Sequence, residues 1–433
     1  MKTVFLPIEV LSRELTARAF LSTKLANNGN KVYVFEHTFF DRNGWKESGV
    51  YIGKNCFRTE VPYTKEYYLS MKKSGVSVWY LDEEGGVYSG DKESQEKRLL
   101  TRIDPSDLQE NDKILSWGYW QKKSYESVCH VSPVIISGSP NFDILQSKYH
   151  NSFLDYDLNI TGGKKDFILI NTRFSLGNPK QQVDSMFGNK QPHSEKLPDF
   201  FLEFSYISDN KMMFSMIELC FYLSKLLPNE LIIIRPHPSE DLKIYNTLTK
   251  KLKNVLVIHK GGAEPWIRMS KVLIHNGCTT AVQADIANKR VISFMPDGSS
   301  ELDKECVPEI PNKIGIVATT NEEVLSAINS KYSNSNNIWK DTISELDSIE
   351  IISKLVNEDA HIESMRNHGF FFRERVKGVV RGIANYIIPS RKNKGFDYEE
   401  FSTIVDLVKI ANDHYKSNVR CKKITNGCYC IHK

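Results

Sequence analysis

The sequence predicts an α/β protein made of two Rossmann-like domains that face each other across a cleft. Its 433 residues are too many for one ordinary domain and suit two domains of about 150–200 residues each. Hydrophobic residues make up 40% and charged residues 25% of the chain, which is the balance of a soluble globular protein. Short apolar runs alternate with amphipathic stretches in both halves, and this alternation is typical of parallel strands joined by crossover helices.

The first half opens with a strand–helix–strand pattern. Residues 2–7 predict a buried strand, residues 12–27 carry a helical apolar stripe, and residues 31–36 predict a second strand after a polar turn. Further short apolar runs follow, each ending in polar turn residues. The strands predicted from these runs are residues 76–81, 113–117 and 134–137. We therefore expect a parallel sheet in the first half.

A polar, glycine-containing stretch at residues 155–166 predicts the linker between the two halves. A buried strand at 167–171 follows it, and then a polar excursion at 175–200, whose length is typical of a functional loop. The later elements expected are helices 212–227 and 279–287 and strands 230–235, 255–259, 272–275 and 290–294. The predicted domains are residues 1–160 and 161–350, followed by a helical, basic C-terminal segment of residues 351–433.

The charge distribution excludes some function classes. A net charge of +4 is too small to indicate nucleic-acid binding, but residues 361–433 carry 14 Lys and Arg against 7 Asp and Glu. Within this segment, residues 372–387 predict a basic amphipathic helix that packs back on the domains; the alternative is docking on an anionic inner-membrane surface. No run of 18 uncharged apolar residues predicts a spanning helix, and charged residues interrupt the N-terminal region. We therefore expect a cytoplasmic protein.

The eight cysteines are scattered without a disulfide framework or a Cys-x-x-Cys motif. A C-terminal cluster, Cys421, Cys428, Cys430 and His432, fits no common zinc spacing, so we expect ordinary reduced thiols.

The first motif with chemical content is Arg235-Pro236-His237-Pro238, directly after a predicted strand. Ligands of open α/β sheets bind outside the carboxyl ends of the strands, and the two prolines restrict the backbone around the imidazole. Arg235 and His237 together suit a phosphate group through charge-assisted hydrogen bonds. The alternative is a plain strand-end turn with a surface histidine.

The second motif runs from His275 through Asn276, Gly277, Thr279 and Thr280, between a predicted strand and a predicted helix. Gly277 permits a tight turn, and the two hydroxyls with the first amides of the helix predict an anion site. An ordinary helix cap would explain one threonine but not the whole set.

Acidic residues form three further candidates. Glu264, at a predicted strand end after two glycines, suits a ribose diol, although acidic helix caps are common. The adjacent carboxylates Asp82, Glu83 and Glu84 repel one another, so at least one pKa should rise and suit a general base; a solvated acidic turn is the alternative. The Asp155-Tyr156-Asp157 motif has the form of a metal site but lies in the predicted linker, so nothing in the chain requires a metal.

Together, the acidic turn, the His-Pro pair and the paired threonines resemble the signature of bacterial sialyltransferases and Kdo transferases, which are GT-B glycosyltransferases that use CMP-activated 2-keto sugar acids. The segments LPIEVLSREL, LDEEGGVY, GSPNFDIL, ILINTRFSLGN, RPHPSED and HNGCTTAVQADIANKRVISF are also similar to bacterial surface-carbohydrate biosynthesis proteins related to β-Kdo transferases. The resemblance covers about residues 1–300.

This resemblance implies a role for each matched residue. It implies that His237 contacts the CMP phosphate, that Thr279 and Thr280 bind its oxygens, and that Glu264 holds the ribose. The general base of an inverting enzyme would be Glu83, with Asp82 and Glu84 equally compatible by register. A retaining enzyme would need a carboxylate nucleophile, for which Asp209 and Asp241 are candidates.

The resemblance implies a metal-independent transferase without a cofactor, which moves a 2-keto sugar acid from CMP to a cell-surface or lipid-linked glycan. Residues 1–160 would then be the acceptor domain and residues 161–350 the donor domain. The alternatives are a related transferase that uses a UDP-sugar or CDP-glycerol, and a non-catalytic partner in polysaccharide assembly. The sequence leaves the sugar acid, the acceptor, the stereochemistry and the oligomeric state open.

Overall fold

The structure is a computed structural model of the whole chain. It describes residues 1–39, 48–54, 63–83, 88–89, 92–103, 105–180, 187, 201–296, 308–330, 337–344, 346–362 and 396–433. The chain forms two compact units, of which unit 1 holds residues 1–86, 96–144 and 340–433, and unit 2 holds residues 87–95 and 145–339.

Unit 1 is built on an eight-stranded sheet in the order β13-β14-β2-β1-β3-β4-β5-β6. Its strands are β1 (Thr3–Ile8), β2 (Lys31–Glu36), β3 (Gly49–Gly53), β4 (Val76–Leu81), β5 (Lys113–Ser116), β6 (Val134–Ile136), β13 (Arg420–Thr425) and β14 (Cys428–His432). The strands from β2 to β6 are parallel, whereas β14 pairs antiparallel with both β2 and β13. The apolar β1 and β4 are buried along their whole length, which is typical of central parallel strands.

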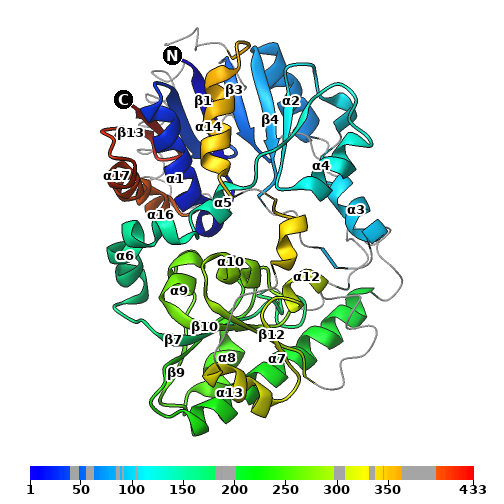
Figure 1. Cartoon of the computed structure of the whole chain (residues 1–433), viewed down its shortest axis with the longest axis vertical. Helices are drawn as coiled ribbons and strands as arrows, with labels where there is room; N and C mark the ends of the chain where they lie inside the picture. The colour runs from blue at the N-terminus through cyan, green and yellow to red at the C-terminus, as the bar shows by residue number, and fades with distance from the viewer. Residues whose placement is uncertain are drawn as a thin grey trace, which may run out of the picture. The chain divides into compact units, whose positions relative to one another are not determined.

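The helices of unit 1 come from both ends of the chain. They are α1 (Leu11–Asn27), α2 (Tyr63–Lys73), α4 (Tyr119–Glu126), α5 (Pro140–Asp143), α14 (Ser348–Glu358), α16 (Tyr398–Ser402) and α17 (Ile404–Tyr415), with α3 (Lys92–Leu100) beginning in the segment of unit 2. Helix α17 packs against α1, and Figure 1 shows the red C-terminal elements beside the blue N-terminal ones.

Unit 2 is built on a six-stranded parallel sheet in the order β12-β11-β10-β7-β8-β9. Its strands are β7 (Phe167–Asn171), β8 (Ile232–Arg235), β9 (Val255–Val257), β10 (Ser270–His275), β11 (Arg290–Phe294) and β12 (Ile316–Ala318). Its helices are α6 (Ser147–Thr161), α7 (Phe201–Leu226), α8 (Leu242–Thr249), α9 (Glu264–Met269), α10 (Thr280–Ile286), α12 (Glu309–Asn312) and α13 (Asn321–Asn329).

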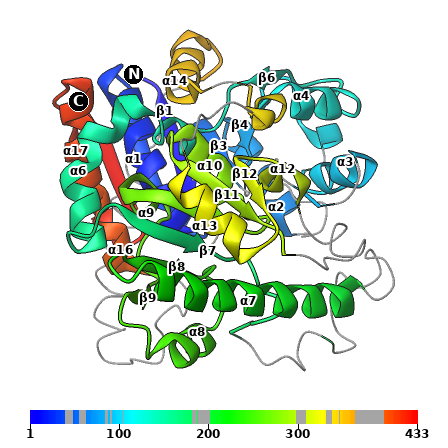
Figure 2. The same cartoon turned by 60° about the horizontal axis from the view of Figure 1, so that its bottom comes forward.

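The long helix α7 packs one face onto this sheet, as Figure 2 shows in green. Three methionines and Leu223 of α7 share one core with alternate apolar residues of β7, β8 and β10. The α/β fold class with two Rossmann-like parallel sheets is therefore confirmed.

The structure corrects the predicted linker at residues 155–166. Residues 155–161 belong to α6, which ends where Gly162 takes a left-handed conformation with φ of 63°. The stretch looked like a linker because it is polar, but Asp157 lies buried on α6 and forms an ion pair with Arg268.

The compact units also differ from the predicted domain boundaries. Residues 145–160 lie in unit 2, and residues 340–433 lie in unit 1 instead of forming a separate segment. The C-terminal segment is not only helical, because its hairpin β13–β14 extends the first sheet. The predicted basic helix at 372–387 lies outside the described residues. Within the described ranges, no helix has both the length and the apolar character needed to cross a bilayer.

Candidate functional site

A row of polar residues marks the carboxyl edge of the unit 2 sheet. Arg235, Asn171 and His275 are the last residues of β8, β7 and β10 and lie in register. All three are buried, and residues in register on neighbouring parallel strands share one face. Arg235 Nε, Asn171 Oδ1 and His275 Nε2 have no hydrogen-bond partner among the described residues. Buried polar atoms are normally paired, so this edge suits a polar ligand or bound water.

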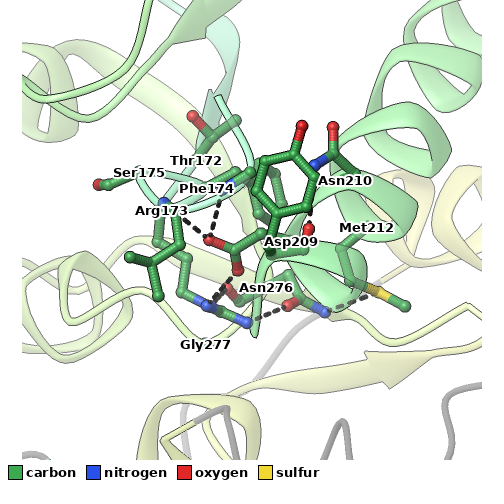
Figure 3. Close-up of polar contacts among 12 residues, drawn as sticks. Thr172, Arg173, Phe174, Ser175, Asp209, Asn210, Met212, Asn276 and Gly277 are labelled. Carbon is green, nitrogen blue, oxygen red and sulfur yellow. Dashed lines mark hydrogen bonds and ion pairs between the residues drawn. The ribbon is translucent and has the colours of Figure 1, made fainter. Parts of the chain in front are cut away.

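The loop after β7 connects this row to helix α7. Arg173 donates from Nε to the Asn276 carbonyl over 2.9 Å and from Nη1 to Asp209 Oδ1 over 2.9 Å. Figure 3 shows these contacts converging from the β7 loop, α7 and the turn after β10. Arg173 was not predicted from the sequence, although a cation two residues beyond a buried strand is a usable signal.

Asp209, a candidate nucleophile, uses both carboxylate oxygens for contacts within the protein. Its Oδ2 accepts the backbone N–H groups of Leu176 over 3.2 Å and Gly177 over 3.4 Å, in addition to the ion pair with Arg173. Burial raises the pKa of Asp209, while Arg173 and the two amides act in the opposite direction. A Cβ atom on Gly177 would lie 2.8 Å from Asp209 Cβ, so the loop can approach the helix only with glycine there. These contacts give Asp209 a structural role in holding the loop.

Asp241, the other candidate nucleophile, is the N-cap of α8. Its side chain accepts the backbone N–H of Lys243 over 2.9 Å. A capping aspartate of this kind stabilises a helix, and a role in transfer stays a prediction.

Glu240, the residue before Asp241, was not selected from the sequence. It is fully buried, and its carboxylate accepts hydrogen bonds from two loops. Its Oε1 accepts the Thr172 hydroxyl over 2.6 Å, the Phe174 N–H over 3.1 Å and the His237 N–H over 2.9 Å. Its Oε2 accepts the Tyr245 hydroxyl over 2.5 Å. Glu240 therefore holds the loop after β7 against the turn that carries His237.

The imidazole of His237 is exposed and has a defined orientation. Its Nδ1 accepts the backbone N–H of Ser239 over 3.2 Å and lies 3.0 Å from the Ser175 hydroxyl. Because Nδ1 accepts, the neutral ring carries its hydrogen on Nε2, which makes Nε2 a donor.

The two threonines predicted to bind phosphate, in the turn after β10, have different surroundings. Gly277 has a left-handed φ of 62°, and its N–H donates to Asn312 Oδ1 over 2.6 Å. Thr280 accepts from Asn171 Nδ2 over 3.0 Å and donates to Cys278 Sγ over 3.0 Å, so its hydroxyl is engaged inside the protein. Thr279 is exposed, and its hydroxyl has no hydrogen-bond partner in the described part of the chain.

Asn276 supports this turn instead of facing a ligand, because its Nδ2 donates to the Phe294 carbonyl over 2.9 Å.

Glu264 is buried at the first position of α9, and burial raises its pKa while Arg268 and Arg235 lower it. Arg235 donates to the Gly261 carbonyl over 2.7 Å, and burial lowers its pKa. That Glu264 contacts a ribose stays a prediction.

In unit 1, the acidic turn after β4 is buried at Asp82 and Glu83, while Glu84 lies outside the described residues. Asp82 accepts the indole N–H of Trp117 at its carbonyl oxygen over 2.8 Å. Glu83 contacts Arg18 Nη2 over 2.6 Å and accepts from Asn141 Nδ2 over 2.6 Å.

The predicted rise in pKa is found at Glu83, whose pKa is raised to about 7. The main cause is burial, and the nearby Glu14 adds to it, whereas Arg18 lowers the value. Repulsion between adjacent carboxylates, the cause expected from the sequence, is therefore not the main one. A carboxyl group with a pKa near neutrality can exchange a proton under physiological conditions.

Further buried charges surround Glu83 at the carboxyl ends of the strands. Lys54, which follows β3, lies 3.3 Å from Glu14 and 2.8 Å from Glu9, which follows β1. Arg18 keeps Nε and Nη1 buried without a hydrogen-bond partner among the described residues. The edge of this sheet therefore holds a charged cluster in which Arg18 still has N–H groups that can donate to a polar ligand.

The raised pKa of Glu83 predicts a pH dependence of stability. The folded state binds the proton of Glu83 more tightly than the unfolded state does, where the carboxyl has its usual pKa of 4.5. Proton binding therefore stabilises the folded state fully below pH 4.5, and this stabilisation is lost as the pH rises toward 7. The difference in unfolding free energy between wild type and Glu83→Gln should fall across this window by up to about 1.4 kcal/mol per pH unit. Urea denaturation at a series of pH values measures it, with the exposed Glu126→Gln as control. A difference that stays constant from pH 4.5 to 7 would contradict the raised pKa.

The two carboxylates of the Asp-x-Asp motif have different surroundings. Asp157 makes a bidentate ion pair with Arg268, over 2.7 Å to Nε and 2.8 Å to Nη2, whereas Asp155 is exposed. In the part of the chain that the structure describes, no cluster of three or more His, Cys, Asp or Glu side chains could hold a metal ion.

No family model and no curated protein matches this chain. Among solved structures, it is similar to UDP-GlcNAc 2-epimerase from Neisseria meningitidis bound to UDP-GlcNAc, with 13% identity over 82% of this chain and 100% of the other and a TM-score of 0.47. The enzyme from Methanocaldococcus jannaschii gives 13% identity over 82% and 99%, with a TM-score of 0.46. The wall teichoic acid polymerase TagF gives 12% identity over 82% and 88%, with a TM-score of 0.46. Similarities at this level assign neither a substrate nor an activity to the chain.

Proposed function

We propose that unit 2 binds the phosphate of a nucleotide-activated sugar at the carboxyl edge of its sheet, and that the chain is a glycosyltransferase. One observation carries this proposal: the loop after β7 touches both turns in which phosphate ligands were predicted. Ser175 contacts His237 on one side, and Arg173 contacts Asn276 on the other. The donors proposed there are the His237 Nε2–H and the Thr279 hydroxyl, since the Ser175 hydroxyl donates to His237 Nδ1.

The donor proposed is a CMP-activated 2-keto sugar acid, of the Kdo or sialic acid type, and the acceptor is a cell-surface or lipid-linked glycan. The sequence motifs support this choice, because together they resemble the signature of transferases that use such donors. A donor with a single phosphate needs less charge neutralisation than a diphosphate, so the proposed reaction uses neither a metal ion nor another cofactor.

In the proposed reaction, the bond between the anomeric carbon and the phosphate oxygen breaks, and its electron pair leaves with CMP. The acceptor oxygen forms the new bond to the anomeric carbon, and the proton of the acceptor hydroxyl passes to a general base, the role predicted for Glu83 from the sequence. His237 donates a hydrogen bond to the departing phosphate, where negative charge increases in the transition state.

The nucleotide is tested by thermal shift with CMP, UDP and CDP-glycerol. CMP at 100 times its Kd should stabilise the protein by about 2.7 kcal/mol. Stabilisation by UDP or CDP-glycerol without any by CMP would support the related transferase classes and contradict the CMP donor.

Replacing His237 by alanine tests the proposed site. We expect turnover of CMP-Kdo or CMP-sialic acid to fall on the order of 10²–10³-fold, as when one donor to a developing charge is removed. The exposed His130 of unit 1 offers a matched control, since His130→Ala should leave turnover unchanged. CMP release measures both. Unchanged turnover in His237→Ala would remove this residue from the mechanism.

A further inference from the structure

A hollow with lysine side chains in its walls lies in unit 1, at the edge of its sheet, away from the charged cluster around Glu83. It has a volume of about 490 Å³. Strands β2, β13 and β14 line it with Lys31, Tyr33, Lys422, Ile424, Cys430 and His432. A volume of this size suits a small ligand such as a sugar phosphate or a nucleotide.

The strand register places the lining residues on one face. Tyr33 of β2 lies opposite Cys430 of β14, which lies opposite Lys422 of β13. Lys31 is two residues before Tyr33 on β2, and its Nζ lies 5.4 Å from the centre of the Tyr33 ring. Because side chains two apart on a strand point to the same side, both lysines flank the same floor.

The hollow is positively charged. Its lining contains no Asp or Glu side chain, and the terminal residues Met1 and Lys433, which also line it, bring two ammonium groups and one carboxylate. Lys31 and Lys422 form no ion pair within the described ranges, and both lie close enough to Cys430 to oppose the rise that burial causes in its pKa. Two ammonium groups without a carboxylate partner, beside His432, create a site for an anion.

We propose that this hollow binds a phosphate-bearing anion through Lys31 and Lys422, with Tyr33 and Cys430 as its floor. A phosphate group matches the site because it offers several acceptor oxygens to two ammonium groups that act as point charges. The anion comes either from a soluble phosphate ester or from the headgroup of an anionic phospholipid. This site is separate from the donor site of unit 2 and does not depend on it.

The test compares the double variant Lys31→Gln/Lys422→Gln with Lys423→Gln. Lys423 is exposed and adjacent in β13, but it lies opposite Tyr429 and so points to the other face of the sheet. All variants carry His237→Ala, so that the proposed donor site does not contribute. The probes are glucose 1-phosphate in calorimetry, and vesicles of phosphatidylcholine with or without phosphatidylglycerol in co-sedimentation.

We expect salt-sensitive binding of at least one probe, weakened about tenfold or more in the double variant and unchanged in Lys423→Gln. Binding of glucose 1-phosphate identifies a soluble ester, and binding only to vesicles with phosphatidylglycerol identifies the lipid. Binding to neither probe overturns the proposal, and so does an equal loss in Lys423→Gln. Circular dichroism and an unchanged thermal midpoint verify that the variants fold.

Discussion

Replacing Glu240 by alanine is expected to lower the free energy of unfolding of unit 2 by about 3–5 kcal/mol. The change removes a fully buried carboxylate that accepts four hydrogen bonds, from Thr172, Phe174, His237 and Tyr245. The Phe174 N–H would lose its buried partner, and the Thr172 and Tyr245 hydroxyls would keep only the 3.5 Å hydrogen bond between them. Each buried group left unpaired costs roughly 1–3 kcal/mol. Urea denaturation measures the loss, and hydrogen exchange in residues 167–176 and 232–246 assigns it to unit 2.

Asp241 provides the matched control for this experiment, because it is the next carboxylate in the chain and its side chain caps α8. Asp241→Ala should cost about 1 kcal/mol, the usual value for losing an N-cap. Glu240→Gln should be milder than Glu240→Ala, because an amide keeps one acceptor oxygen. An effect of Glu240→Ala no larger than that of Asp241→Ala would contradict the role given to Glu240.

Breaking the ion pair between Asp157 and Arg268 should have an effect of similar size. Asp157 has no exposed surface, and Arg268 stacks over the Phe153 ring at 4.1 Å. Asp157→Asn leaves the guanidinium buried beside a neutral group, so we expect a loss of about 3–5 kcal/mol. The exposed Asp155, in the same motif, should tolerate Asp155→Asn within about 0.5 kcal/mol.

This pair of variants also distinguishes a structural motif from a metal site. If the motif bound a divalent cation, both substitutions would reduce the stimulation of turnover by Mg²⁺ or Mn²⁺. The structural role instead predicts a loss of stability in Asp157→Asn alone. Equal stability of the two variants, with a shared loss of metal stimulation, would contradict that role.

Local patterns in the sequence were sufficient to predict the central strands. The runs at β2, β4, β7 and β11 were predicted with the bounds that the structure shows, because buried parallel strands need short, continuous apolar segments. The hairpin β13–β14 was not predicted. Its pairing with β2 joins residues almost 400 positions apart, and β13 is rich in lysine and partly exposed.

The candidate site was predictable where residues directly follow strands. Arg235, His237 and the turn after β10 were selected for that reason, and the structure places them at one edge of the sheet. The buried partners could not be predicted in the same way. Glu240 looks like an ordinary polar residue in the sequence, and Asp209 was selected there only as a candidate nucleophile. Only the folded chain brings them to Thr172 and Arg173.

The most direct test is a crystal structure of the protein with CMP. We expect electron density for the phosphate within hydrogen-bonding distance of His237 Nε2, with the Thr279 hydroxyl on its other side. A nucleotide bound only elsewhere on the protein, with its phosphate remote from both side chains, would contradict it.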